Sequence, residues 1–236
     1  MRILVDSKDY STPSNFAVIF PEPITASRFR ILKCGLPYTT YNIRSNVNNN
    51  VTIKEGVTDY TTTLTPGFYT ITTLMAHMVT KINAIPGILY VYSMASDNNT
   101  SLVTISATGS FIVRLSVSGQ PWGMLGFEGT TDTGSATSHT GTLVPILIER
   151  YFRIICHELT RNLMFSDYYR GADSSTLLIV PIDNDHGTIL TADLDDRIEA
   201  NFHGPVRFKT LDFELTFEDG LEQANLNGGR WYILFE

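Results

Sequence analysis

The sequence predicts an all-β-dominated fold, a β-sandwich with a small inserted or appended α+β unit. Short segments that alternate apolar and polar residues recur along the 236-residue chain, and turn-forming Gly, Pro, Asn and Asp separate them. Only the stretch near residues 71–84 shows the 3.6-residue period of an amphipathic helix. A chain of this length can bury a sizeable core as one large β domain or as a domain with an insertion.

Strands are expected on both sides of the helix, wherever β-branched and aromatic residues alternate with polar ones. Before the helix they are Arg2–Val5, Phe16–Phe20, Ser27–Tyr38, Val51–Ile53 and Tyr60–Leu64, the last two joined by a hairpin turn at Glu55-Gly56. After it they are Ile88–Tyr92, Leu102–Ser106, Phe111–Val117, Tyr151–Ile155, Leu177–Ile182, Phe208–Phe217 and Trp231–Phe235. Residues 129–141 are rich in Gly, Thr and Ser, which predicts a surface loop or linker.

The expected helix has clear start and stop signals. Thr70 is a suitable N-cap, and Pro86 with Gly87 ends the helical pattern. Its apolar residues recur at spacings of three and four and so line one face: Ile71, Leu74, Met78 and Ile82. This face predicts packing against a small sheet formed by residues 51–64 and 88–117.

Charge and cysteine content limit the function classes. The net charge is −7, which disfavours a broad nucleic-acid footprint, because such footprints need clustered Lys and Arg. Cys34 and Cys156 lie among apolar residues, which favours buried free thiols over a disulfide. No secretory signal and no run of about 20 apolar residues is visible, so we expect a soluble protein made in a reducing compartment.

Motifs for metal binding are incomplete. His157-Glu158 begins a zinc-protease pattern, but Arg161 stands where the second His is required. Asp183-Asn184-Asp185 resembles a calcium loop without its bidentate Glu, although Asp193, Asp195 and Asp196 follow at a distance. A polar turn is the simpler interpretation of these carboxylates.

Motifs for catalysis are also missing. No Ser lies in a nucleophile elbow, and Gly67 lacks the companions of a phosphate-binding loop. Trp122, Tyr168 and Tyr169 are candidates for stacking on sugars or bases, but core or interface roles are more common for such residues. We therefore expect a protein that is not an enzyme, with no catalytic residues, no cofactor and no metal.

Several segments, taken in order, resemble a known family. They are the Phe16–Pro23 strand, Leu36–Asn42, the helix start Pro66–Thr70, Val103–Ile105, Leu125–Phe127, the Phe208–Phe217 strand, Asp219-Gly220 and the closing Asn227–Trp231. This order resembles the penton or minor capsid proteins of icosahedral double-stranded DNA viruses of the double-jelly-roll lineage. Virophages, polinton-like viruses and their large-virus relatives belong to that lineage.

The resemblance implies a single jelly-roll β-sandwich at the five-fold vertices of a virion. It implies a homopentamer that joins the surrounding major capsid protein and other minor capsid proteins, and that is made in the host cytoplasm or nucleus. It also implies an inserted domain that points outward, where a host receptor or glycan is a further possible partner. A glycan- or receptor-binding β-sandwich of a viral tail or spike is the alternative function.

The chain is longer than a bare jelly roll, which implies an additional unit. We place the sandwich at residues 1–49 and 144–236, and the inserted α+β unit at residues 50–143, including the linker at 129–141. The alternative division is an N-terminal domain at residues 1–127, with residues 143–236 belonging to a second β domain.

Overall fold

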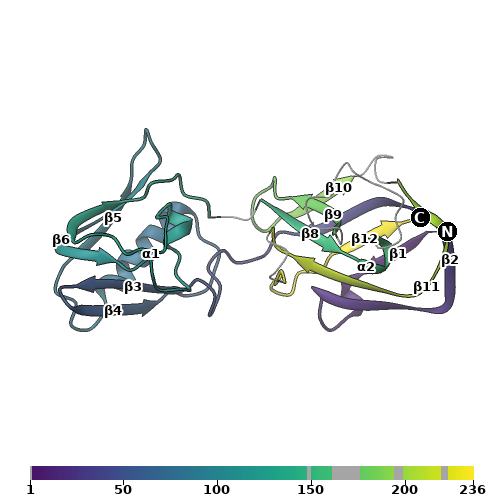
Figure 1. The fold of residues 1–236 in the computed structure, drawn as a ribbon, viewed down its shortest axis with the longest axis horizontal. Helices are drawn as coiled ribbons and strands as arrows, with labels where there is room; N and C mark the ends of the chain where they lie inside the picture. The colour runs from purple at the N-terminus through teal and green to yellow at the C-terminus, as the bar shows by residue number, and fades with distance from the viewer. Residues whose placement is uncertain (1, 148–149, 161–175, 194–198, 219–222) are drawn as a thin grey trace. The chain divides into compact units, whose positions relative to one another are not determined.

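The protein is described by a computed structural model that covers residues 2–147, 150–160, 176–193, 199–218 and 223–236 (Figure 1). The chain divides into two compact units. The first, here called the sandwich unit, combines Met1–Thr40 with Glu149–Glu236. The second, here called the inserted unit, is Tyr41–Ile148.

One long strand, β2 (Asn15–Pro37), organises the sandwich unit because it contributes to both layers. Its first half pairs with β11, and that layer continues through β8 to β9. Its second half pairs with β12 and β10, and β1 pairs with β12. The bounds of these strands are β1 Ile3–Asp6, β8 Tyr151–Ile155, β9 Thr176–Pro181, β10 Ile189–Asp193, β11 Glu199–Thr216 and β12 Tyr232–Phe235. The described residues of this unit also form two short helices, a 3-10 helix at Ser7–Asp9 and α2 at His157–Thr160.

Aromatic side chains join the two layers of the sandwich unit. The rings of Phe213 on β11 and Phe235 on β12 lie 6.4 Å apart between centroids, and both side chains are buried. Phe16 on β2 packs against Trp231 at 5.5 Å. Alternate residues of each strand therefore face a shared core, as expected for a β-sandwich. The predicted fold class, an all-β-dominated jelly-roll sandwich with a small α+β unit, is confirmed.

The prolines near the start of β2 do not end the strand, contrary to the prediction of separate strands at Phe16–Phe20 and Ser27–Tyr38. The β2–β11 register is irregular between the pairs Ile24–Phe208 and Ile19–Thr210, so residues 20–23 have no regular partner. Pro21 and Pro23 fall within this irregularity. Their missing N–H groups therefore cost no ladder hydrogen bond, and the strand continues through the bend.

The inserted unit is a five-stranded antiparallel sheet with one helix, and it has its own core. The strand order is β4-β3-β6-β5, and β7 pairs with β6. The bounds are β3 Asn50–Glu55, β4 Thr58–Thr63, α1 Ile71–Asn83, β5 Tyr92–Ser96, β6 Val103–Val113, a 3-10 helix η2 at Trp122–Leu125, and β7 Ala136–Thr140. The predicted hairpin turn is confirmed, with Gly56 in the left-handed region at φ +57°.

Helix α1 forms as predicted. Thr70 is the N-cap of a capping box in which its side chain and that of Thr73 each accept a hydrogen bond from the other residue's backbone N–H. Its buried face packs against β4 and β5 and consists of Leu74, Met75, Met78 and Ile82. After the helix, Pro86 is followed by Gly87 at φ +84°. The predicted packing of α1 on the small sheet is therefore confirmed.

Three strand predictions and one linker prediction in the inserted unit need correction. Most of Ile88–Tyr92 is a loop, and the strand there is β5. The separate strands Leu102–Ser106 and Phe111–Val117 are replaced by the continuous β6. The linker expected at residues 129–141 contains β7.

The strand β7 forms because small hydroxyl residues pair across it. The hydroxyls of Thr104 and Thr140 lie 2.8 Å apart, and those of Ser106 and Ser138 lie 3.1 Å apart. Such cross-strand hydroxyl pairs stabilise a sheet without any apolar pattern. A composition that indicates a linker is therefore compatible with an edge strand.

The boundaries of the inserted unit differ from those expected at residues 50 and 143. Residues 41–49 belong to this unit because Asn42 Nδ2 donates to the Tyr69 carbonyl at 2.7 Å, and Ile43 forms a β-bridge with Gly67. The alternative division at residues 127 and 143 does not match the pairing of β2 with β10, β11 and β12. Segments from both sides of the inserted unit build one sandwich.

Candidate interaction surfaces

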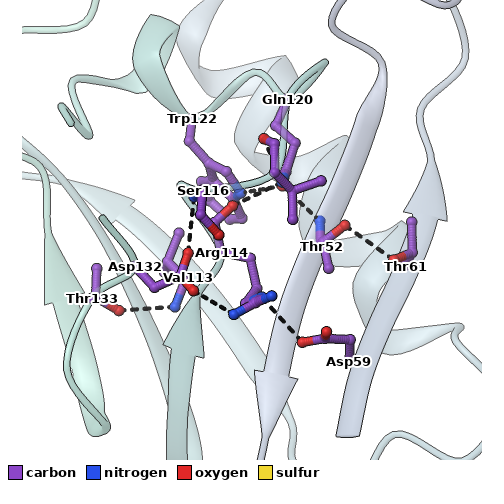
Figure 2. Close-up of polar contacts among 11 residues, drawn as sticks. Thr52, Asp59, Thr61, Val113, Arg114, Ser116, Gln120, Trp122, Asp132 and Thr133 are labelled. Carbon is purple, nitrogen blue, oxygen red and sulfur yellow. Dashed lines mark hydrogen bonds and ion pairs between the residues drawn. The ribbon is translucent and has the colours of Figure 1, made fainter. Parts of the chain in front are cut away.

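The inserted unit contains a dense polar network around Gln120 (Figure 2). The Gln120 Oε1 atom accepts hydrogen bonds from the Thr52 backbone N–H and from the Trp122 indole N–H, each at 2.8 Å. Its Nε2 atom donates to the carbonyls of Arg114 at 2.8 Å and Val117 at 3.0 Å. One amide side chain thus connects β3, the segment after β6, and η2.

Arg114 extends this network toward two carboxylates. Its guanidinium forms an ion pair with Asp59 on β4 at 3.2 Å and another with Asp132 (Figure 2). Asp132 also accepts from the Ser116 backbone N–H at 2.9 Å, and this bond, together with Arg114, holds the pKa of Asp132 below its usual range. The side chains of this network bind one another and connect several segments of the inserted unit, and we call the network the structural clasp.

A buried carboxylate lies at the opposite end of β3 from the loop through which the chain enters the unit. Glu55 is 3% exposed and accepts hydrogen bonds from the Leu89 N–H at 2.9 Å, the Tyr90 N–H at 3.2 Å and the Tyr92 hydroxyl at 2.9 Å. Burial is the main cause that raises the pKa of Tyr92, and the neighbouring Glu55 carboxylate raises it further. Glu55 therefore fixes the conformation of the loop that precedes β5.

The residues around this anchored loop carry exposed apolar side chains. Val57 in the β3–β4 turn is 94% exposed, Leu89 is 72% exposed and Val91 is 66% exposed. We call these three residues the tip surface. Since Glu55 precedes the turn and binds the loop, the three lie at one end of the unit. Fixed loops with exposed apolar residues are suited to contacts with other molecules.

The sandwich unit has a second apolar surface on the outer side of the layer β1-β12-β2-β10. Cross-strand register places Leu4 opposite Leu234, and Ile189 opposite Pro37. Leu4 is 60% and Ile189 61% exposed. Tyr232 lies across Gly35, where a Cβ atom would overlap its ring. We call this surface the outer face: Leu4, Pro37, Ile189, Tyr232 and Leu234.

The metal motifs considered from the sequence lie only partly within the described residues, and their described members do not come together. Glu158 on α2 accepts from the Asp212 backbone N–H at 3.0 Å, and burial together with Glu158 raises the pKa of Asp212. Asp183 and Asp185 are exposed in the turn after β9, while Arg161, Asp195 and Asp196 lie outside the described residues. Within the described part of the chain, no group of three or more His, Cys, Asp or Glu side chains is placed to hold a metal ion.

The cysteines are free and buried, as predicted. Burial raises the pKa of both thiols, Cys34 and Cys156, to about 12. Because the thiolate is the reactive form, neither is suited to nucleophilic chemistry near neutral pH.

The aromatic candidates are a core residue and two residues that the structure does not describe. Trp122 is 1% exposed and packs on Phe127, so stacking on a ligand is excluded for it, and Tyr168 and Tyr169 lie outside the described residues. The sequence did not predict the tip surface, because Leu89 and Val91 fall in the segment expected to be a strand and Val57 is a single apolar residue in a turn. Among the described helices, none is long and apolar enough to cross a membrane.

Comparison with known proteins yields structural similarity only. No protein-family model and no curated protein sequence matches the chain. The fold is similar to the crystal structure of the mavirus penton protein, with 10% sequence identity, a TM-score of 0.48, and coverage of 100% of this chain and 98% of that one. It is also similar to a chain in the cryo-EM structure of the Sputnik virophage, with 11% identity, a TM-score of 0.42, and coverage of 99% and 97%. The virophage proteins indicated by the sequence resemblance are thus found among its structural neighbours.

Proposed function

We propose that this protein is a structural virion protein, a penton or vertex subunit that assembles as a homopentamer and joins the surrounding major capsid protein. The observation that carries the proposal is the outer face. Leu4 and Ile189, on the first and last strands of one layer, are both more than half exposed. Between them lie Tyr232 and Leu234, which face Asp6 and Lys33 in the register, so the apolar side chains of the outer face alternate with two charged ones.

An apolar sheet face of this kind favours burial against another subunit. Removing apolar area from water contributes about 25 cal/mol per Å², so several such side chains stabilise an interface appreciably. If the outer face meets a different surface of an identical neighbour, the contact is heterologous and repeats until a ring closes. The family resemblance alone supplies the number five.

In this proposal the inserted unit carries recognition and the sandwich unit carries assembly. The tip surface lies at the end of β3 away from the entering chain, and Glu55 fixes its loop. A protein receptor or a glycan is a suitable partner class for such a surface. The same feature is the observation that favours the alternative, a receptor-binding β-sandwich of a viral tail or spike.

Native mass spectrometry and negative-stain imaging of the full chain test the proposal. We expect pentamers and five-fold rings. A stable monomer at high concentration, or a trimer, would contradict it and favour the spike alternative. In imaging of assembled particles, we expect the chain at the five-fold vertices with residues 41–148 outward, and a position away from the vertices would contradict the vertex assignment.

A further inference from the structure

A cavity of about 150 Å³ opens in the sandwich unit beneath the bend of β2. Its walls come from β1, β2, β11, β12 and α2, and they are largely apolar. The side chains that define its apolar interior are Phe20, Phe29, Phe202, Phe208, Leu211 and Phe235. Each of these is at least nine-tenths buried.

The bend explains why this volume is not filled. The β2–β11 register is irregular on both sides of the pairs that join residues 24–26 to residues 206–208, so the two strands separate from the ideal ladder there. The ring of Phe202 packs against Phe29 at 5.7 Å and against Phe208 at 5.4 Å, in tilted geometry. Rigid rings fixed in this way cannot collapse into the remaining space.

The polar groups of the lining lie at its rim. Thr25, Arg28 and Glu236 are exposed residues, and the Glu236 carboxylate forms an ion pair with Arg30 at 3.2 Å. A buried water needs two to four polar partners, and the described side chains of the interior supply none. The interior is therefore suited to an apolar group, with the rim available to a polar substituent that faces solvent.

We propose that this cavity is a binding site for a small apolar molecule with a single aromatic ring. A cavity of about 150 Å³ lined by apolar side chains stays dry and accepts benzene in a well-studied engineered protein, which sets the matching ligand size. The five Phe rings of the interior offer edge and face contacts to such a ring. The proposal does not depend on the assignment as a virion protein.

Toluene is the probe for the test, added to the full chain in increasing concentration. We expect a saturable rise in the melting temperature of about 3–6 °C at roughly ten times the dissociation constant. In NMR spectra we expect nuclear Overhauser contacts between toluene and the side chains of Leu211 and Phe208. Absence of a saturable shift, or contacts with residues outside the cavity, would overturn the proposal.

A variant that fills the cavity and a matched control variant test whether toluene binds in this cavity. Ala26 lines the cavity and Ala17 lies on the same strand at an exposed position, so Ala26→Leu reduces the free volume whereas Ala17→Leu does not. We expect Ala26→Leu to lose toluene binding at least tenfold and Ala17→Leu to retain it. Equal binding by both variants would refute the site. If Ala26→Leu does not fold, the variant cannot report on binding. The Overhauser contacts between toluene and the wild-type protein then locate the site.

An aromatic side chain of a neighbouring protein is the competing occupant of the cavity. If toluene does not bind but Ala26→Leu prevents association with another chain, the site is an anchor pocket. That result would replace the small-molecule proposal.

Discussion

The hydroxyl of Tyr92 donates a hydrogen bond of 2.9 Å to the buried carboxylate of Glu55. Through this contact the first residue of β5 is joined to the last residue of β3, although β6 lies between these strands in the sheet. The same carboxylate accepts the backbone N–H groups of Leu89 and Tyr90. One ionisable side chain thus connects a hairpin, a loop and an edge strand at the tip surface.

Replacing Glu55 should loosen this loop. Glu55→Gln keeps the shape of the side chain but places an amide NH2 donor against the three groups that donate to Glu55. We therefore expect a loss of about 2–4 kcal/mol in the free energy of unfolding of the inserted unit. Urea denaturation measures the loss, and faster amide exchange at Leu89 and Tyr90 locates it. The control is Glu128→Gln, an exposed position in the same unit, with an expected change within about 0.5 kcal/mol. Equal effects of the two substitutions would contradict the role of Glu55.

The interaction at Glu55 shows why the sequence does not predict the loop. Ile88–Tyr92 has the composition of a strand, but Glu55 captures the N–H groups of Leu89 and Tyr90 that a ladder would use. Such a long-range contact overrides local propensity. Helix α1 was predictable because its cap and its apolar period are both local signals, and each agrees with the tertiary packing.

The candidate surfaces were less predictable than the fold. The outer face depends on cross-strand register, which brings Leu4 beside Leu234 from opposite ends of the chain. No local pattern encodes that pairing. The structural clasp of Gln120 likewise joins segments far apart in sequence, and a single Gln carries no recognisable motif. The incomplete metal motifs could be recognised in the sequence because ligand spacing is local on a helix or loop.

The buried face of α1 gives a direct stability prediction. Leu74 is fully buried, so Leu74→Asp places an unpaired charge in the core of the inserted unit. We expect a loss of about 3–5 kcal/mol in the free energy of unfolding, or failure of this unit to fold. Ala76→Asp on the exposed side of the same helix should cost less than about 1 kcal/mol. A melting temperature of Leu74→Asp within a degree of the wild type would show that the helix is not packed as described.

Removing the side chain of Gln120 should weaken the structural clasp. Gln120→Ala leaves the Thr52 N–H and the Trp122 indole N–H without their acceptor, at an expected cost of about 2–3 kcal/mol. Chemical denaturation measures the cost, and an upfield shift of the Trp122 indole proton reports the lost bond. Asn98→Ala, in an exposed turn of the same unit, is the control. An unchanged indole resonance would mean that Gln120 does not hold the indole in solution.

The buried thiols make stability fall at alkaline pH. Burial raises the pKa of Cys34 from 9.0 to about 12, so the folded thiol keeps its proton where the unfolded thiol loses it. The contribution of the buried thiol to the free energy of unfolding is complete below pH 9. It is lost as pH rises toward 12, at about 1.4 kcal/mol per pH unit for this group. Urea denaturation of the wild type and Cys34→Ala from pH 8 to 10.5 should give a shallower decline for the variant. Parallel declines would indicate that Cys34 is accessible to solvent.

Charged substitutions on the outer face separate assembly from folding. Leu4 and Ile189 are largely exposed in the single chain, so Leu4→Glu and Ile189→Glu should each change its stability by no more than about 0.5 kcal/mol. In an assembly that buries this face, the new carboxylate would be desolvated without a partner, which costs several kcal/mol at each interface. We therefore expect both variants to remain folded and to lose the oligomer in light scattering.

The matched control for these variants is Ile19→Glu. Ile19 is 70% exposed, but it lies on the first half of β2, where the strand pairs with β11 in the other layer. We expect this variant to keep the oligomer, because its carboxylate stays outside the outer face. If Ile19→Glu dissociates the oligomer while Leu4→Glu and Ile189→Glu leave it intact, the contact surface lies on the β2–β11 layer, and the outer face is not the site of assembly.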